Sequence, residues 1–268
     1  VYHLAGMLGG EPVPDEAYRA LHVDGTGNVL RAAQEAGVGR VVHVSSPGVL
    51  GPIVDPPADE TRPHAPSNIY EATKSAGEKL ALAFGRRQHL SLTVARPEFV
   101  YGPGDTHVLG LFRAIQKGRF FFIGSGENLV HPTFVDDAVQ GMLLCAQAGQ
   151  AGRVYHIAGP APVSMRRLAS VLAAALGVRV PLLHVPKRLA AVGAVGLEWA
   201  TRIVPFRPPL SRGAINFFTE TRAFSTARAE AELGYRAQVL LEEGVRRTVA
   251  WYQQLGLLSC RTERDSDR

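Results

Sequence analysis

The chain of 268 residues has little cysteine and no apolar run long enough to cross a bilayer. Its two cysteines, Cys145 and Cys260, are too few and too far apart in the sequence for a disulfide framework or a zinc site. The longest apolar stretch, residues 189–204, is interrupted by Glu198 and Arg202 and is shorter than the about 20 residues that a spanning helix needs. We therefore predict a cytoplasmic protein in a reducing compartment, without a metal site.

The sequence also lacks a patch of charge of one sign. Its formal net charge is +5, but the lysines and arginines are spread along the chain and interleave with carboxylates. A nucleic-acid groove needs a basic stripe with stacking aromatic side chains, so we predict a small-molecule substrate and no nucleic-acid partner. A hydrophobic content of 46% with 20% charged residues is ordinary for a globular protein.

Strand and helix patterns alternate through the first half of the chain. Residues 1–5, 40–45 and 90–95 have the apolar, largely β-branched character of buried parallel strands, and helical patterns over 16–36 and 70–85 separate them. This alternation predicts an α/β fold with a doubly wound parallel sheet. We expect residues 1–150 to form part of a nucleotide-binding domain, 151–258 a smaller substrate-binding region, and 259–268 a frayed polar tail.

Tyr70 and Lys74 are the candidate acid/base pair. Four residues apart on a helix, they lie one above the other, so the ammonium can favour the ionised phenol. The pattern alone is weak, because such pairs occur on many helix surfaces. Ser45 and Ser46 follow a predicted strand about one βα unit upstream. Alone they indicate strand capping, but with Tyr70 downstream they favour a catalytic site.

Further motifs extend this pattern over nearly the whole chain. They are Val1 to Gly6, Gly25-Thr26-Gly27, Tyr101-Gly102-Pro103-Gly104-Asp105, Phe134-Val135-Asp136-Asp137 and Ala231-Glu232-Leu233-Gly234-Tyr235. In this order they resemble the extended short-chain dehydrogenase/reductase superfamily, in its NAD-dependent epimerase/dehydratase group. The resemblance implies a Rossmann-like sheet, a cofactor that is NAD or NADP, and hydride transfer.

The resemblance also implies roles for particular residues. Tyr70 would pass a proton to or from the substrate oxygen, Ser46 would hold that oxygen, and Lys74 would lower the tyrosine pKa and hold the nicotinamide ribose. The residues expected at the cofactor, besides Tyr70 and Lys74, are Leu4, Ala5, Gly6, Ser45, Pro97, Glu98 and Phe99. In this family the backbone of the loop that begins at Pro97 covers the carboxamide.

The glycine-rich turn of a dinucleotide fold is missing from the sequence. Neither G-x-x-G-x-x-G nor G-x-G-x-x-G occurs, and Val1 to Ala5 matches the strand that the family places fourth. We expect the first strands, with the residue that selects NAD or NADP, to lie in a missing N-terminal part. As given, the chain is expected to bind a dinucleotide poorly and to be impaired as an enzyme.

The substrate class is predicted from departures at three positions. Sugar-nucleotide members carry phosphate-binding Asn and Arg where this chain has Phe99 and Val130, and sugar dehydratases carry an acidic pair where it has Pro47-Gly48. The pattern is closest to the 3β-hydroxysteroid dehydrogenase and dihydroflavonol reductase branch. We expect an apolar substrate in a pocket that is lined by Phe99, Val130, Phe206, Phe217 and Phe218, although plain core packing is as good an explanation for each of them.

Two alternatives to an oxidoreductase of apolar alcohols stay open. One is a nucleotide-sugar 4-epimerase that uses Tyr70 in the same way, and the other is a non-catalytic dinucleotide sensor. His22 replaces an Asn of the relatives, which implies a modified proton path to the lysine. The apolar segment 189–204 suggests contact with a membrane surface, and a homodimer is a further expectation.

Overall fold

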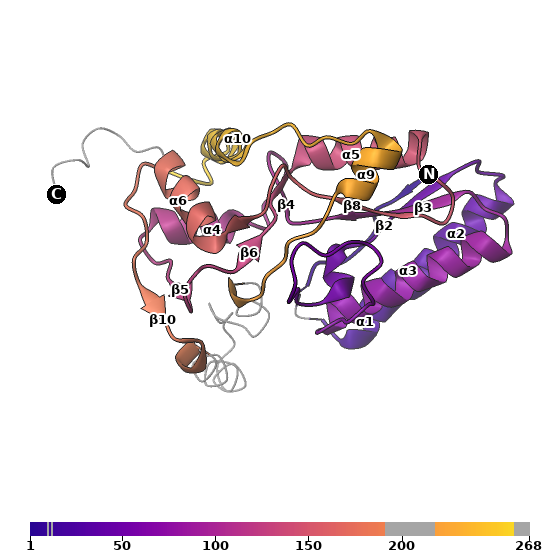
Figure 1. Ribbon diagram of the computed structural model, residues 1–268, viewed down its shortest axis with the longest axis horizontal. Helices are drawn as coiled ribbons and strands as arrows, with labels where there is room; N and C mark the ends of the chain where they lie inside the picture. Colours follow the sequence, from indigo (N-terminus) through magenta and orange to yellow (C-terminus); the bar gives the residue numbers. More distant parts are fainter. Residues whose placement is uncertain (10, 12, 191–217, 260–268) are drawn as a thin grey trace.

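A four-stranded parallel sheet forms the centre of the N-terminal part. The computed structural model describes residues 1–9, 11, 13–190 and 218–259. Strands β1 (Tyr2–His3), β2 (Val41–Val44), β3 (Leu92–Pro97) and β8 (Val154–Ile157) pair in that order, all parallel (Figure 1). The predicted α/β class is confirmed, because helices connect each strand to the next.

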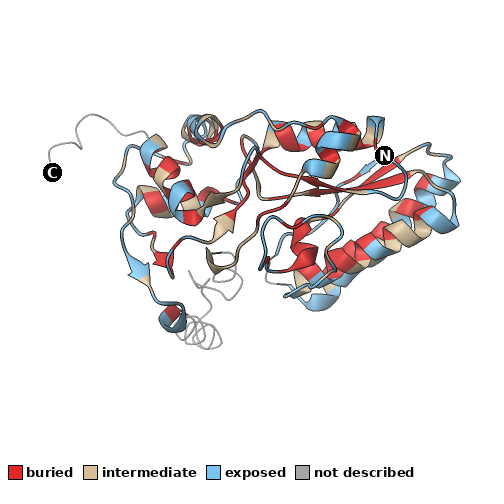
Figure 2. Ribbon diagram, viewed as in Figure 1, coloured by how far each residue is buried: buried red, intermediate tan, exposed pale blue. Residues whose placement is uncertain are grey.

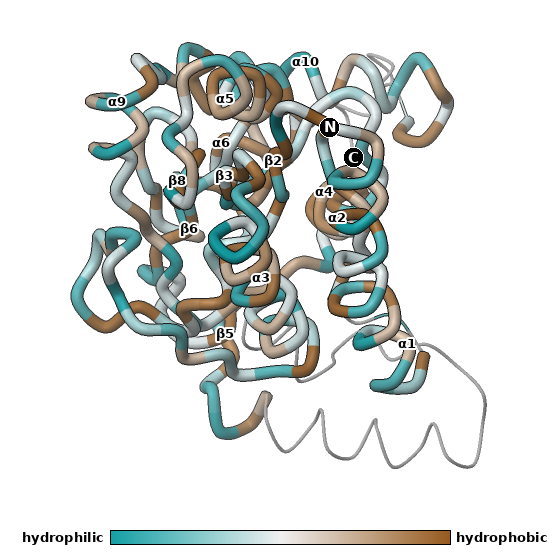
Figure 3. Tube along the Cα trace, turned by 90° about the vertical axis from the view of Figure 1, so that its right-hand side faces the viewer, coloured by the Kyte–Doolittle hydropathy of each residue, from teal (hydrophilic) through white to brown (hydrophobic). Residues whose placement is uncertain are grey.

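Helices cover both faces of this sheet. Figure 3 shows α5 (Val135–Gln147) and α9 (Ala227–Leu233) on one side of β2, β3 and β8, and α3 (Ile69–Arg87) and α2 (Gly25–Glu35) on the other. Strands β2, β3 and β8 are largely buried on both faces, as Figure 2 shows, which is why their sequences are largely apolar and do not alternate, whereas Tyr2 of the edge strand β1 is exposed. The site must therefore lie at the strand ends.

The helix that the sequence predicts over residues 16–36 is divided into three parts. Helix α1 (Asp15–Arg19) continues through a π-helical turn, η1 (Ala20–Asp24), into α2. Helix α3 crosses this turn at close range: a Cβ on Gly77 would lie 2.3 Å from the carbonyl oxygen of His22. The widened turn and the missing side chain of Gly77 bring the backbone at His22 against the helix that carries Tyr70.

A second cluster of helices lies beyond the sheet. Helices α4 (Leu109–Gln116), α6 (Met165–Ala175) and α10 (Leu241–Gln254) pack around an apolar core with short strand pairs. The pairs are β4 (Val100–Tyr101) with β7 (Thr133–Phe134), β6 (Leu129–Val130) with β9 (Val163–Ser164), and β5 (Phe122–Ile123) with β10 (His184–Val185). Strand β8 comes after residue 150 in the sequence but pairs with the main sheet, and α4 comes before residue 150 but packs in this second cluster. The predicted domain boundary at residue 150 therefore stays a prediction.

The long loop 51–67 is tied to the segment 219–225, here called the crossing segment. Ile53 and Ala58 donate backbone hydrogen bonds to Thr221 and Ala223, and the opposite side of the crossing segment bonds to Leu129. The crossing segment therefore runs between the long loop and β6. Most of the apolar segment 189–204, from residue 191 on, lies outside the described residues, and so do Phe206 and Phe217.

Candidate active site

Ser46 and Tyr70 meet at the carboxyl end of the sheet. Ser46 follows β2 and caps the 3-10 turn η2 (Pro47–Leu50), where its hydroxyl accepts the Gly48 N–H at 3.1 Å. Tyr70 lies in the first turn of α3, whose N-cap Asn68 accepts the Glu71 N–H. The Ser46 hydroxyl lies beside the Tyr70 phenol, whose pKa it lowers. Two hydroxyl groups thus converge where a substrate oxygen could accept from both.

Lys74 lies one turn further along α3, as the i, i+4 spacing predicts. It is 7% exposed, and its Nζ donates to the Val44 carbonyl at 2.7 Å. Burial lowers the pKa of Lys74 to about 8, although the Glu78 carboxylate opposes that shift. The ammonium is therefore held against the end of β2, below Tyr70.

The Tyr70 phenol is harder to ionise than the sequence predicts. Its burial raises its pKa above the ordinary value, the neighbouring Ser46 hydroxyl opposes this, and the Glu98 and Glu71 carboxylates raise it further. In the protein alone, desolvation and neighbouring carboxylates outweigh the expected help from Lys74. Tyr70 therefore holds its proton.

Both ring nitrogens of His22 have hydrogen-bond partners. Its Nε2 accepts the Met7 N–H at 2.9 Å, so its proton lies on Nδ1, which donates to Thr73 Oγ1 at 2.9 Å. Burial and the charge of Lys74 lower its pKa to about 4, which keeps the ring neutral. The modified proton path through His22 stays a prediction. The ring joins the loop after β1 to α3 and packs edge-on against Tyr70.

The residues predicted to contact a cofactor follow the ends of three adjacent strands. Leu4, Ala5 and Gly6 leave β1 exposed, and the loop continues to Gly9, where a Cβ would lie 3.5 Å from the Tyr70 ring. Pro97 ends β3. An open edge beside Tyr70 and Lys74 fits the nicotinamide and ribose of a dinucleotide. In the described part, however, the helix after this loop begins with Asp15 and Glu16, which repel a pyrophosphate.

Two other residues of that prediction are enclosed. Ser45 is 4% exposed, and its hydroxyl lies beside Glu78, whose pKa it helps to lower. The Glu98 N–H donates to the Ile157 carbonyl, and the Glu98 carbonyl accepts from Thr133 Oγ1 at 2.5 Å. Both positions belong to the edge of the sheet, and their contact with a cofactor stays a prediction.

Arg222 is a site residue that the sequence analysis missed. The crossing segment brings it to α3, where its Nη2 donates to Glu71 at 2.6 Å and to Glu220 at 3.0 Å. A Cβ atom added to Gly48 would lie 3.1 Å from Arg222 Nη1 and 3.3 Å from the Ser46 hydroxyl oxygen. The guanidinium of Arg222 and the Ser46 hydroxyl therefore approach the same side of Gly48. A separation of 151 residues between Arg222 and Glu71 leaves no local sequence signal for this contact.

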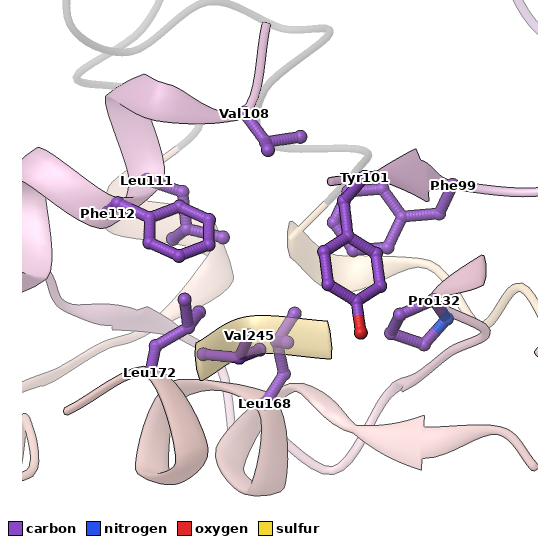
Figure 4. A pocket seen from close by; sticks show the side chains of 9 residues that line it. All are labelled: Phe99, Tyr101, Val108, Leu111, Phe112, Pro132, Leu168, Leu172 and Val245. Atoms are coloured by element: carbon purple, nitrogen blue, oxygen red, sulfur yellow. The ribbon is translucent and has the colours of Figure 1, made fainter. Parts of the chain in front are cut away.

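The apolar side chains expected to line the substrate pocket belong largely to the second core. Val130 is 1% exposed, and Phe218 packs against the same cluster. Phe99 lines a small cavity of about 10 Å³ among the side chains that Figure 4 shows, which has room for about one water molecule. A larger cavity, of about 290 Å³, is lined by Pro56, Pro57 and the crossing segment, but by no predicted site residue.

Replacing His43 by Leu is expected to raise the free energy of unfolding. The His43 ring in β2 is 2% exposed, and neither nitrogen has a hydrogen-bond partner in the described part. His43→Leu should add about 1 kcal/mol at neutral pH, because an unsatisfied polar group leaves the core. Burial and the charge of Lys74 lower the His43 pKa to about 3. Only the unfolded chain therefore takes up this proton as the pH falls below the ordinary value of about 6.5.

At about pH 5, protonation of His43 in the unfolded chain should cost the wild type about 2 kcal/mol of unfolding free energy. The variant has no such histidine, so its stability advantage over the wild type should grow by the same amount. Urea unfolding at the two pH values measures the difference. His107→Leu, at an exposed histidine, is the control and should show no such growth. A gain for His43→Leu that is the same at both pH values would contradict the argument.

Comparison with known proteins extends the pattern over the chain. Residues 1–158 match the model of the NAD dependent epimerase/dehydratase family. A 4-hydroxy-2-methyl-3-oxo-4-farnesyl-3,4-dihydroquinoline-1-oxide ketoreductase of Stigmatella aurantiaca is 31% identical over 251 residues, which cover 91% of this chain and 75% of that protein. A 3beta-hydroxysteroid-dehydrogenase/decarboxylase of Arabidopsis thaliana is 32% identical over 257 residues. That alignment covers 88% of this chain and 58% of that protein.

A solved structure has the same fold. The dTDP-glucose 4,6-dehydratase DesIV of Streptomyces venezuelae, solved as a double mutant with NAD bound, superposes with a TM-score of 0.75 and 27% identity. The match covers 94% of this chain and 72% of that one. The parallel sheet and the helices around it are therefore shared with a protein that binds NAD.

Proposed function

Because the chain belongs to the NAD-dependent epimerase/dehydratase family, we propose that it transfers hydride between a nicotinamide and a secondary alcohol or ketone at Tyr70. Family membership makes it an NAD(P)-dependent oxidoreductase. The observation that carries the assignment of the site is the convergence of the Ser46 and Tyr70 hydroxyls at the carboxyl edge of the sheet, with Lys74 buried below them.

Each of these residues has a separate task in the proposed reaction. Ser46 and Tyr70 donate hydrogen bonds to the substrate oxygen, and Tyr70 gives up its proton as an alkoxide forms. The bound nicotinamide supplies or accepts the hydride. Lys74 keeps a positive charge below the phenol and so stabilises the phenolate that remains. The exposed edge at Leu4 to Gly6 and the end of β3 at Pro97 would hold the cofactor.

The proposed substrate is an apolar molecule of the steroid-like kind. The two relatives above are named for a farnesylated quinoline oxide and for a 3β-hydroxysteroid. Val130 lies in the apolar core and Phe99 faces apolar side chains, so neither position offers a group that binds phosphate. This favours an apolar ketone over a nucleotide sugar, the substrate of the epimerase alternative.

Oxidation of NADH and of NADPH with a panel of ketones tests the proposal. We expect turnover with bulky apolar ketones, and no turnover with nucleotide 4-ketosugars that have the same reacting group. Conversion of a UDP-hexose without net change in NADH would instead favour the epimerase. Because weak binding of the dinucleotide is expected, both cofactors are raised to saturation, and absence of turnover with every ketone at saturating cofactor would contradict the proposed function.

We also propose contact of the tip formed by residues 179–189 with an anionic membrane surface, where an apolar substrate dissolves. Leu182, Leu183 and Leu189 are 82%, 63% and 64% exposed, at the end of the molecule that holds β10 (Figure 1). Lys187 and Arg188 are also exposed, and no Asp or Glu occurs between residues 138 and 197. None of the described helices is long and apolar enough to cross a membrane.

Sedimentation with phospholipid vesicles tests this contact. We expect binding to vesicles rich in phosphatidylserine and loss of most of it in the double variant Leu182→Asp, Leu183→Asp, because exposed apolar side chains and basic residues act together at such surfaces. Val139→Asp with Leu143→Asp, an exposed apolar pair on α5, is the matched control. Equal loss in the control would show that the tip has no special role.

A further inference from the structure

We propose that Glu98 is a second acid/base group of the site, which removes and returns a proton at the carbon next to the substrate carbonyl. The inference rests on the proposed function for the placement of a ketone at Tyr70. It adds keto–enol chemistry, which needs a base for carbon in addition to an acid for oxygen. The acidic pair that sugar dehydratases use is absent at Pro47-Gly48. Glu98 enters the same site from a different loop.

The backbone fixes the position of Glu98. It follows β3 directly, its N–H donates to the Ile157 carbonyl at 3.0 Å, and its carbonyl accepts from Thr133 Oγ1. The next residue, Phe99, has a φ of 35°, which turns the chain sharply after Glu98. Since neighbouring strands hold this corner on both sides, the side chain cannot swing away into solvent.

The Glu98 carboxyl group is buried without a hydrogen bond. The residue is 6% exposed, and neither of its carboxyl oxygens accepts from a described residue. The residue keeps a small exposed fraction and is therefore not sealed from the surroundings of the site. A buried carboxyl group that forms no hydrogen bond within the described part of the chain has a cost in stability, which a role in the site explains.

The charged groups around Glu98 leave it free to exchange a proton. Arg222 is the cation whose charge acts on Glu98, but its Nη2 is already bound to Glu71 and Glu220. The other titratable neighbours are Glu71, which repels a second negative charge, and Tyr70, whose ionisation Glu98 disfavours. Burial raises the pKa of Glu98 to about 7, since the attraction of Arg222 is countered by Glu71. Near neutral pH both the base and its acid are therefore populated.

The proposed step is balanced without an oxidant. The Glu98 carboxylate takes a proton from the carbon next to the carbonyl, and the electron pair of that C–H bond forms a carbon–carbon double bond. The carbonyl π electrons move to oxygen, which takes the proton of Tyr70 while Ser46 holds it. Return of a solvent proton from Glu98 to carbon, and of the oxygen proton to Tyr70, regenerates the ketone.

Hydrogen exchange in D₂O tests the proposal. A ketone that the enzyme reduces is incubated with the protein and the oxidised nicotinamide, so that no hydride is available, and deuterium at the adjacent carbon is followed by NMR. We expect exchange by the wild type and a loss of about 10²-fold or more in Glu98→Gln. The rate should rise with pH through about 7, and this rise should be absent in the variant.

Two further measurements separate the possible outcomes. Glu220→Gln removes another carboxylate from Arg222, so it should keep exchange and move its pH dependence to lower pH. Hydride transfer is measured on the same samples, with circular dichroism to check folding. Glu98→Gln that exchanges as fast as wild type, or a wild type that transfers hydride without exchange, would overturn the role of Glu98 alone. Failure of both reactions in the wild type would overturn the proposed function and this inference together.

Discussion

Tyr70→Phe is expected to lower the rate of hydride transfer by about 10²- to 10⁴-fold, the usual contribution of a positioned general acid. The change removes one oxygen, and with it the only group that shares the substrate oxygen with Ser46. Since burial and the Glu98 and Glu71 carboxylates keep the phenol protonated, the loss should be largest in the direction of ketone reduction. Stopped-flow measurement of the hydride step, at saturating ketone, gives the rate directly.

The fold and the binding of ligands should survive Tyr70→Phe. The phenol is half-buried, and the ring remains in contact with His22 and the loop at Gly9. The binding free energy of the ketone should therefore weaken by only about 1 kcal/mol, the contribution of one lost hydrogen bond. Tyr2→Phe, at an exposed tyrosine of β1, is the control. A Tyr70→Phe enzyme with more than half of the wild-type rate would place the acid elsewhere.

The parallel sheet and the Ser46, Tyr70, Lys74 group could be predicted from sequence because their signals are local. Buried parallel strands are continuously apolar, and a spacing of four residues puts Tyr70 and Lys74 on one helix face. The cap of α6 at Ser164 follows the same logic, and the structure has it: the Ser164 hydroxyl accepts the Arg167 N–H at 3.1 Å. Such features depend on neighbouring residues alone.

Contacts across long sequence separations could not be predicted. Arg222 reaches Glu71 only because the crossing segment is bonded to both the long loop and β6. Two carboxylates in the first turn of a helix are typical of helix capping, as at Asp136 and Asp137 of α5, but Asp137 accepts the N–H groups of Gln238 and Val239, and Asp136 bonds Arg247. In both cases the partner is chosen by tertiary packing, and no spacing in the sequence encodes it.

The raised pKa of Tyr70 has the same origin. A tyrosine four residues before a lysine predicts a lowered pKa, and this is the right sign for that pair alone. The net direction depends on how far the phenol is removed from water and on Glu98, which lies at the end of another strand. To predict the pKa of a group in a site, the positions of all the neighbouring charges must therefore be known. The acid itself can be proposed from the sequence without them.

Breaking the buried pair of Glu78 and Arg96 is expected to have the largest effect on stability. Arg96 Nε and Nη2 donate to the two carboxylate oxygens of Glu78 at 2.9 and 2.6 Å, and Nη2 also bonds His64. Both side chains are at most 2% exposed. Glu78→Gln should lower the free energy of unfolding by about 3 to 5 kcal/mol, because it leaves a guanidinium in the core without a counter-charge. Chemical denaturation at neutral pH measures this difference.

The large expected effect of Glu78→Gln comes from the burial of the ion pair and not from the pairing itself. Arg166 and Glu127 form the same kind of ion pair at 2.8 Å, but their side chains are 47% and 62% exposed. Glu127→Gln should therefore change the free energy of unfolding by about 0.5 kcal/mol or less. Equal effects of Glu78→Gln and Glu127→Gln would contradict the argument, since water would then be stabilising Arg96 as well as Arg166.

Acid should weaken the same contact in the wild type. Burial opposes ionisation of Glu78, but the neighbouring His64, whose Nε2 lies 3.4 Å away, and the hydrogen bonds and charge of Arg96 prevail, so the folded-state pKa lies well below the ordinary value. The contribution of the pair is thus complete above about pH 4.3, where the carboxyl is ionised in the unfolded chain too, and is lost as the pH falls further. Below that pH the difference between wild type and Glu78→Gln should shrink steadily. A difference that stays constant would show that Glu78 stabilises the fold by its shape and not by its charge.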